Sequence, residues 1–223
     1  MARDISDEYL VDHYPNALER TADHWLHVVA IALAGFGAAW LIERALSTHR
    51  ASLVFAAGVY GAALICMLVF SAIYNLGRAP TSRPFLRRLD EVGIFLMIAG
   101  SYTPFTTQRL VGPWAVGMTA LVWGIALAGI IGKLAFTRIS ERFWTALYVL
   151  FGWVAVLALH PFSRSLSIST LGLLAAGGLT YTAGSLAFLN PRLPFRRAIW
   201  HGFVCAGAAL HFGAIAGGVV LVP

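Results

Sequence analysis

Seven apolar stretches follow one another along the chain, with only short polar segments between them. They cover residues 25–45, 53–74, 94–107, 114–134, 143–159, 166–189 and 199–222. A helix of roughly 20 apolar residues crosses the hydrocarbon core of a bilayer, and most of the stretches reach that length. The pattern therefore predicts an all-α integral membrane protein built as a bundle of seven transmembrane helices.

The third stretch is short, and its helix reaches the length of a span only if it begins near Asp90. A carboxylate at or inside the membrane boundary is costly and usually has a partner or a function. Two interpretations of Asp90 follow. It belongs to a functional site, or it forms a salt bridge at the boundary with the neighbouring Arg87 or Arg88.

The composition agrees with a membrane protein. Of the 223 residues, 59% are hydrophobic and 12% are charged, whereas soluble domains carry about 25% charged residues. Seven spans leave no room for a separate soluble domain, so we expect a polar N-terminal segment, residues 1–24, and one membrane domain, residues 25–223. Because the formal charge of +6 is spread over loops beside the spans, it suits contact with anionic lipid headgroups rather than nucleic acid.

The basic residues predict the orientation. Twelve of the sixteen lysines and arginines lie in the N-terminal segment or in the loops that follow the second, fourth and sixth stretches. The other four are Arg44, Arg50, Arg109 and Arg164. Since basic residues concentrate on the cytoplasmic side, the N-terminus is expected in the cytoplasm and the C-terminus outside.

In this orientation, polar side chains from four helices reach one layer near the cytoplasmic surface. They are Asp23, His27, Ser71, Asn75, Asp90, Glu91, Arg197 and His201. The pairs at positions 23 and 27, 71 and 75, and 197 and 201 are four residues apart and share a helix face. These side chains either converge on one site or serve separately as helix-to-helix hydrogen bonds and boundary residues.

Several motifs resemble the hemolysin III family, a bacterial branch of the progestin and adipoQ receptor superfamily that is distantly related to alkaline ceramidases. They are E-R-T-A-D-H-W-L-H at 19–27, S-A-I-Y-N at 71–75, L-D-E-V-G-I-F-L-M-I-A-G-S-Y-T-P-F at 89–105, G-G-L-T-Y-T-A-G at 177–184 and A-I-W-H-G-F-V at 198–204. The resemblance extends over all seven stretches. It implies a seven-helix bundle with an inward N-terminus in the bacterial inner (plasma) membrane.

The resemblance also implies a zinc site with two positions changed. In zinc-binding relatives, one histidine from the second span and two from the seventh hold the metal, and an aspartate holds its water. Asp90 and His201 match this pattern as candidate metal residues, whereas Asn75 and Arg197 stand where histidines are expected. Because catalytic zinc sites use three protein ligands, and arginine offers only donors, we expect no zinc or weakly bound zinc.

Arg197 has two interpretations. Its guanidinium takes over part of the charge of the missing metal and pairs with Asp90 or Glu91, or it extends to the lipid headgroups.

Three functions are consistent with the sequence, and membrane lipids are the expected partners of the first two. The protein acts on or senses membrane lipid through the polar layer. Alternatively, it is a zinc-dependent, ceramidase-like lipid amide hydrolase with Ser71, Asp90 and His201 as catalytic residues. In that case zinc-bound water is the nucleophile, Asp90 is the base and Ser71 stabilises the oxyanion. The third possibility is a cytolytic, pore-forming protein. Whether the protein is an enzyme, and its oligomeric state, are left open.

Overall fold

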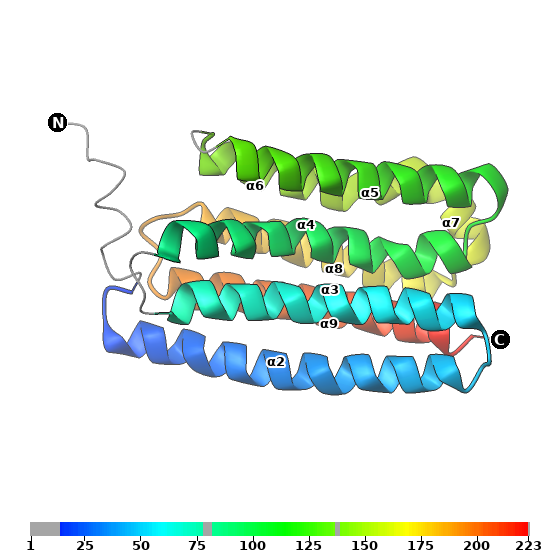
Figure 1. Ribbon diagram of the computed structural model, residues 1–223, viewed down its shortest axis with the longest axis horizontal. Coiled ribbons are helices and arrows are strands. Elements are labelled where there is room, and N and C mark those ends of the chain that lie inside the picture. Colours follow the sequence, from blue (N-terminus) through cyan, green and yellow to red (C-terminus); the bar gives the residue numbers. More distant parts are fainter. Residues whose placement is uncertain (1–13, 78–81, 137–138, 223) are drawn as a thin grey trace.

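The long helices lie side by side, with nearly parallel axes, in one elongated bundle (Figure 1). The structure is a computed structural model that describes residues 14–77, 82–136 and 139–222. Every regular element in these ranges is helical. The predicted all-α class is therefore confirmed for the described part of the chain.

Six helical stretches among the described residues are long and apolar enough to cross a membrane. The elements are α2 (Ala17–Leu46), α3 (Ala51–Leu76), α4 (Arg83–Gln108), α5 (Gly112–Ala135), α6 (Glu141–Gly152), η2 (Trp153–Ala158), α7 (Leu159–Ser165), α8 (Ile168–Phe188), α9 (Arg196–Ile215) and η3 (Ala216–Val220). The six stretches are α2, α3, α5, α8, the run from α6 to α7, and α9 with η3.

Helix α4, which carries the third predicted span, is not among the six, although it is as long as α3. Charged residues crowd its first turns, and threonines and a glutamine occupy its last turn. Composition rather than length therefore separates α4 from the other helices. The helix begins at Arg83, so Asp90 lies about two turns inside it.

The predicted fifth span, residues 143–159, is divided into α6, η2 and the start of α7. The Tyr102 hydroxyl of α4 donates to the carbonyl of Gly152 at 2.7 Å and accepts the N–H of Ala155 at 2.7 Å. A side chain inserted between the hydrogen-bonded turns of a helix interrupts its regular pattern. Tyr102 thus accounts for the break and joins α4 to this part of the chain.

The centre of the bundle is packed with small and aliphatic residues, and many large apolar side chains point outward. Leu41, Tyr60 and Ile215 are fully buried, whereas Phe36 is 75% exposed and Val116 is 73% exposed. Gly100 allows α4 to approach α3, because an added Cβ there would lie 2.4 Å from the Cβ of Ala63. Such outward apolar surfaces and small-residue contacts are typical of helices packed in lipid.

Four helices bring polar side chains to the same end of the bundle, at the left of Figure 1, where α2, α4 and α9 begin and α3 ends. The side chain of Asn16 caps α2 by accepting the N–H of Glu19 at 2.9 Å. The helix therefore begins at Ala17, before the predicted span. This early start places Asp23 and His27 on one buried face of regular helix.

Candidate functional site

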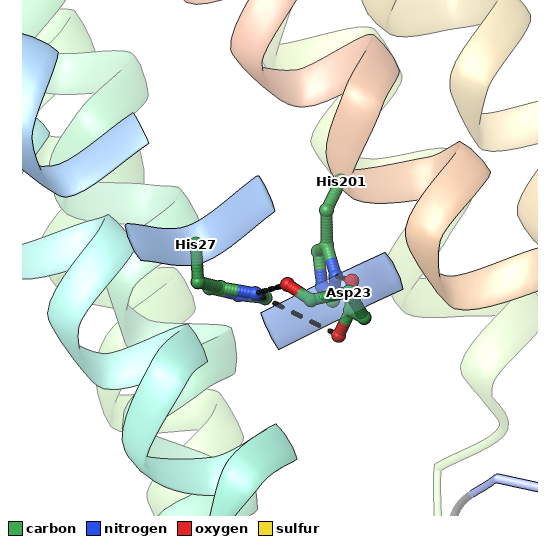
Figure 2. Close-up of side chains that lie close together, drawn as sticks. All are labelled: Asp23, His27 and His201. Atoms are coloured by element: carbon green, nitrogen blue, oxygen red, sulfur yellow. Dashed lines mark hydrogen bonds and ion pairs between the residues drawn. The ribbon is translucent and has the colours of Figure 1, made fainter. Parts of the chain in front are cut away.

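The carboxylate of Asp23 lies at the centre of the polar end of the bundle and is fully buried. One of its oxygens, Oδ1, is 2.6 Å from Nδ1 of His201 on α9. The other, Oδ2, accepts a hydrogen bond from the hydroxyl of Tyr14. Asp23 therefore joins α2, α9 and the segment before α2. Figure 2 shows the two histidines directed towards Asp23.

Tyr14 lies outside the helices. Burial, together with the neighbouring Asp23 carboxylate, raises the pKa of its hydroxyl above the ordinary value. The hydroxyl consequently keeps its proton and acts as a donor to Asp23. Because ionised carboxylates only accept hydrogen bonds, this contact and the one from His201 satisfy both oxygens of a buried acid.

The two buried histidines have the same tautomer. Nδ1 of His27 lies 2.8 Å from the main-chain carbonyl oxygen of Asp23, and Nδ1 of His201 faces the Asp23 carboxylate. Both partners can only accept, so each Nδ1 carries a hydrogen and donates it. In the neutral rings, Nε2 is then the nitrogen with a free lone pair. The rings are 4.5 Å apart between centroids.

Both Nε2 atoms point at the hydroxyl of Ser71 on α3. Its Oγ lies 3.2 Å from Nε2 of His27 and 3.3 Å from Nε2 of His201. A serine hydroxyl has one hydrogen to donate. The Asp90 carboxylate is a further hydrogen-bond partner of this hydroxyl. At least one of the two imidazole lone pairs therefore receives no hydrogen from Ser71.

Asn75 and Arg197 complete this side of the site. The amide Nδ2 of Asn75 donates to the carbonyl oxygen of Ser71 at 3.0 Å and to its Oγ at 3.2 Å. Nη1 of Arg197 donates to Oδ1 of Asn75 at 2.9 Å. The guanidinium thus holds the amide with its NH₂ group towards Ser71. Asn75 is a partner of Arg197 that the sequence did not predict.

The two acidic residues at the start of α4 face different neighbours. Asp90 lines the same cavity as Ser71 and His201, and its carboxylate interacts with both. The Glu91 carboxylate lies 2.8 Å from Nζ of Lys133 on α5 and 3.4 Å from Nε of Arg87. Asp90 therefore belongs with the histidines and Ser71, whereas Glu91 belongs to an ion-pair network beside the site.

An apolar cavity of about 120 Å³ opens from these polar groups into the bundle. Most of its lining is apolar, including Leu26, Met67 and Trp153. Tyr181 also lines it, and the hydroxyl of Tyr181 is buried with no hydrogen-bond partner among the described residues. A second cavity, of about 450 Å³, shares Tyr102 and Trp153 with the first. The two cavities therefore lie next to each other along α4 and α8, with the first one beside the polar cluster.

Asp23, His27 and His201 together could hold a metal ion, because their ligand atoms lie within 4.8 Å of one another. Imidazole and carboxylate are ligand types that zinc accepts. In the observed arrangement, however, the oxygens of Asp23 accept hydrogen bonds from Tyr14 and His201.

At the positions that the resemblance assigns to zinc, only His201 is an imidazole, and Asn75 and Arg197 are bonded to each other. Arg197 adds a permanent positive charge beside the site. These residues do not fit the zinc site that the resemblance implies.

Sequence reasoning placed eight polar residues in one layer: Asp23, His27, Ser71, Asn75, Asp90, Glu91, Arg197 and His201. The structure brings seven of their side chains together, and Glu91 lies in the ion-pair network beside them. Sequence reasoning did not identify Tyr14, which approaches from the N-terminal segment. A buried aspartate two turns into a helix needs a hydrogen-bond donor from another part of the chain. The spacing of residues in the sequence does not identify Tyr14 as that donor.

The fold and the site together define a multi-pass helical membrane protein with a buried polar cluster at one end. A family model described as Haemolysin-III related matches residues 16–212. The chain belongs to this family.

Individual relatives agree with that assignment. The chain is 37% identical to hemolysin-3 of Bacillus cereus over 172 residues, which cover 77% of this chain and 78% of the relative. A hemolysin-3 homolog of Bacillus subtilis is 29% identical over 205 residues, 92% of this chain and 96% of the relative. The human monocyte to macrophage differentiation factor is 28% identical over 214 residues, 90% of this chain and 84% of the relative.

Proposed function

We propose that the protein binds membrane lipid at the cytoplasmic end of a seven-span bundle in the bacterial inner membrane, and that it acts on or senses this lipid. In this proposal α4 also crosses the membrane, which brings the number of spans to seven. The N-terminus and the polar site face the cytoplasm, and the C-terminus lies outside. The distribution of arginines and lysines between the two ends supports the orientation. The position of α4 beside α3 in the bundle supports counting α4 as a span (Figure 1).

One observation carries the proposal: a buried polar cluster opens directly onto apolar space. Ligand pockets are mostly apolar with a few placed polar groups, and a lipid has the same division between headgroup and acyl chain. The Ser71 hydroxyl and the Asp90 carboxylate lie at the polar end of the cavity. The buried Tyr181 hydroxyl, without a protein partner among the described residues, offers a further contact to a polar group of the occupant.

The first test is photocrosslinking with a phospholipid and a ceramide, each carrying a photoreactive group on its acyl chain, in vesicles that contain the full-length protein. We expect crosslinks to residues of α4 and α8. The variant Ser101→Phe places a large ring at a position that lines both cavities. It should reduce crosslinking about tenfold or more, because losing ~1.4 kcal/mol of acyl-chain burial already weakens binding tenfold.

Gly117→Phe is the matched control, because Gly117 lies on α5 with no other atoms within 4 Å of an added Cβ. Its crosslinking should equal that of the parent. Equal crosslinking of the Ser101→Phe and Gly117→Phe variants would contradict lipid binding in the cavity. Leakage of an entrapped dye from the same vesicles would instead support the pore-forming alternative.

A further inference from the structure

Three side chains from three helices form a hydrogen-bonded series. Oδ1 of Asp23 is 2.6 Å from Nδ1 of His201, and Nε2 of His201 is 3.3 Å from Oγ of Ser71. A carboxylate that orients an imidazole, which in turn contacts a hydroxyl, is the arrangement that activates serine as a nucleophile on unrelated folds. The series is recognised by its geometry and not by the order of its residues in the sequence.

We propose that Ser71 is a nucleophile that accepts the acyl group of a lipid ester or amide, with His201 as its general base. This inference rests on the proposed lipid function and specifies its chemistry. Asp23 is a positioning residue: its carboxylate keeps the hydrogen of His201 on Nδ1 and so leaves the Nε2 lone pair directed at Ser71. Tyr14 holds the second oxygen of Asp23 in place.

The second histidine strengthens this arrangement. Nε2 of His27 lies 3.2 Å from the same serine oxygen, and its Nδ1 is held by the main-chain carbonyl of Asp23. Both lone pairs and the Asp90 carboxylate, which also hydrogen-bonds to Ser71, therefore compete for one hydroxyl hydrogen. Whichever imidazole accepts that hydrogen, the other is available to accept a second hydrogen bond, for example from a water molecule.

The two residues that replace the expected zinc ligands provide donors at the same place. The Asn75 amide donates towards Ser71 Oγ at 3.2 Å, and Arg197 holds that amide through Oδ1. When Ser71 attacks a carbonyl, negative charge develops on an oxygen next to the new bond. Preorganised donors close to that oxygen stabilise the transition state. Asn75 is the donor, through the amide hydrogen that it directs at Ser71 Oγ before the reaction, and Arg197 is its positioning residue and a fixed positive charge.

The reaction balances with water as the second reactant. Ser71 Oγ bonds to the acyl carbon while its hydrogen passes to Nε2 of His201. The tetrahedral intermediate breaks its bond to the leaving alcohol or amine, which takes that hydrogen. Water then gives a hydrogen to His201 and attacks the acyl carbon, and the bond to Oγ breaks as Ser71 regains its hydrogen. The products are a fatty acid and an alcohol or amine.

The lining of the cavity, apolar with a few polar groups, suits this class of substrate. The acyl chain would occupy the apolar space beside Met67 and Trp153, which places its carbonyl next to Ser71. Asp90 lines the same cavity and is a hydrogen-bond acceptor for the attacking water.

The test uses a fluorophosphonate with a long alkyl chain, which reacts covalently with activated serines, on the full-length protein in detergent. Mass spectrometry should locate one adduct on Ser71, and Ser71→Ala should abolish it. His201→Gln should slow labelling at least about a hundredfold, because removing the base of such a triad costs several orders of magnitude. Ser163→Ala, which replaces an exposed serine at the other end of the bundle, should label like the parent.

A second variant separates reactivity from folding. In Ser71→Cys the new thiol should react with an alkyl iodoacetamide at least about tenfold faster than Cys66 and Cys205 of the same chain, because a neighbouring imidazole promotes the thiolate. The nucleophile assignment would be overturned if Ser71 did not react with the fluorophosphonate. It would also be overturned if the introduced thiol reacted with the iodoacetamide no faster than the native cysteines. Labelling that requires added zinc would overturn it as well. Lipid crosslinking of Ser71→Ala tests the proposed lipid binding separately, since binding does not need the hydroxyl to react.

Discussion

The double variant Asn75→His, Arg197→His is expected to bind about one zinc ion per chain, whereas the parent protein purified without chelators should contain far less. The two substitutions add imidazoles beside His201, which makes three, the usual number of protein ligands in a catalytic zinc site. The side chains at positions 75 and 197 are directed towards each other, because Nη1 of Arg197 donates to Oδ1 of Asn75. Replacing Arg197 also removes a permanent positive charge that opposes the cation.

Elemental analysis of the two proteins, purified in parallel, measures this difference. The single variants Asn75→His and Arg197→His are the matched controls and should hold less zinc than the double variant, since each leaves one ligand position unfilled. A parent protein that already carries one tightly bound zinc per chain would contradict the interpretation of Asn75 and Arg197. In that case Asp23, His27 and His201 would be the ligands to test next.

Replacing Asp23 is expected to have the largest effect on stability. Asp23→Ala leaves Nδ1 of His201 and the hydroxyl of Tyr14 without their buried acceptor. Leaving a buried donor without its acceptor typically costs about 1–3 kcal/mol of unfolding free energy, and this variant leaves two such donors. Thermal unfolding in detergent should therefore show a clear loss of stability relative to the parent.

His24→Ala is the matched control for this prediction, because His24 neighbours Asp23 on the same helix but is exposed. Exposed substitutions away from such networks usually change stability by no more than about 0.5 kcal/mol. If Asp23→Ala and His24→Ala unfold alike, the buried carboxylate does not join α2 to α9 in the way that the structure indicates.

The apolar pattern predicted most of the fold, because a helix in lipid needs a long apolar run. Residues 25–45 and 53–74, for example, lie inside α2 and α3. Two features escaped this reasoning. Helix α4 begins in charged residues, so its composition alone does not identify it as a span. The break after Gly152 depends on Tyr102, which is distant in the sequence.

The sequence predicts which site residues share a helix face, but not which side chains form hydrogen bonds with one another. Spacing places His27 on the face of Asp23, and Asn75 on the face of Ser71, because residues four apart share a helix face. The partners across helices depend on how far each helix extends and how it is rotated. The contact of Arg197 with Asn75 is therefore known only from the structure. The same is true of the contact of Tyr14 with Asp23, because Tyr14 lies outside the helices.

The central claim is that a hydrogen bond to Asp23 orients His201 towards Ser71, and the protonation of the His201 ring tests it most directly. In protein labelled with ¹⁵N at its histidines, His201→Gln identifies the two ring signals of His201. We predict that Nδ1 carries the hydrogen and that its signal shifts in Asp23→Asn, which keeps the shape of the carboxylate but removes its charge. A His201 ring with a bare Nδ1 and its hydrogen on Nε2 would contradict the claim.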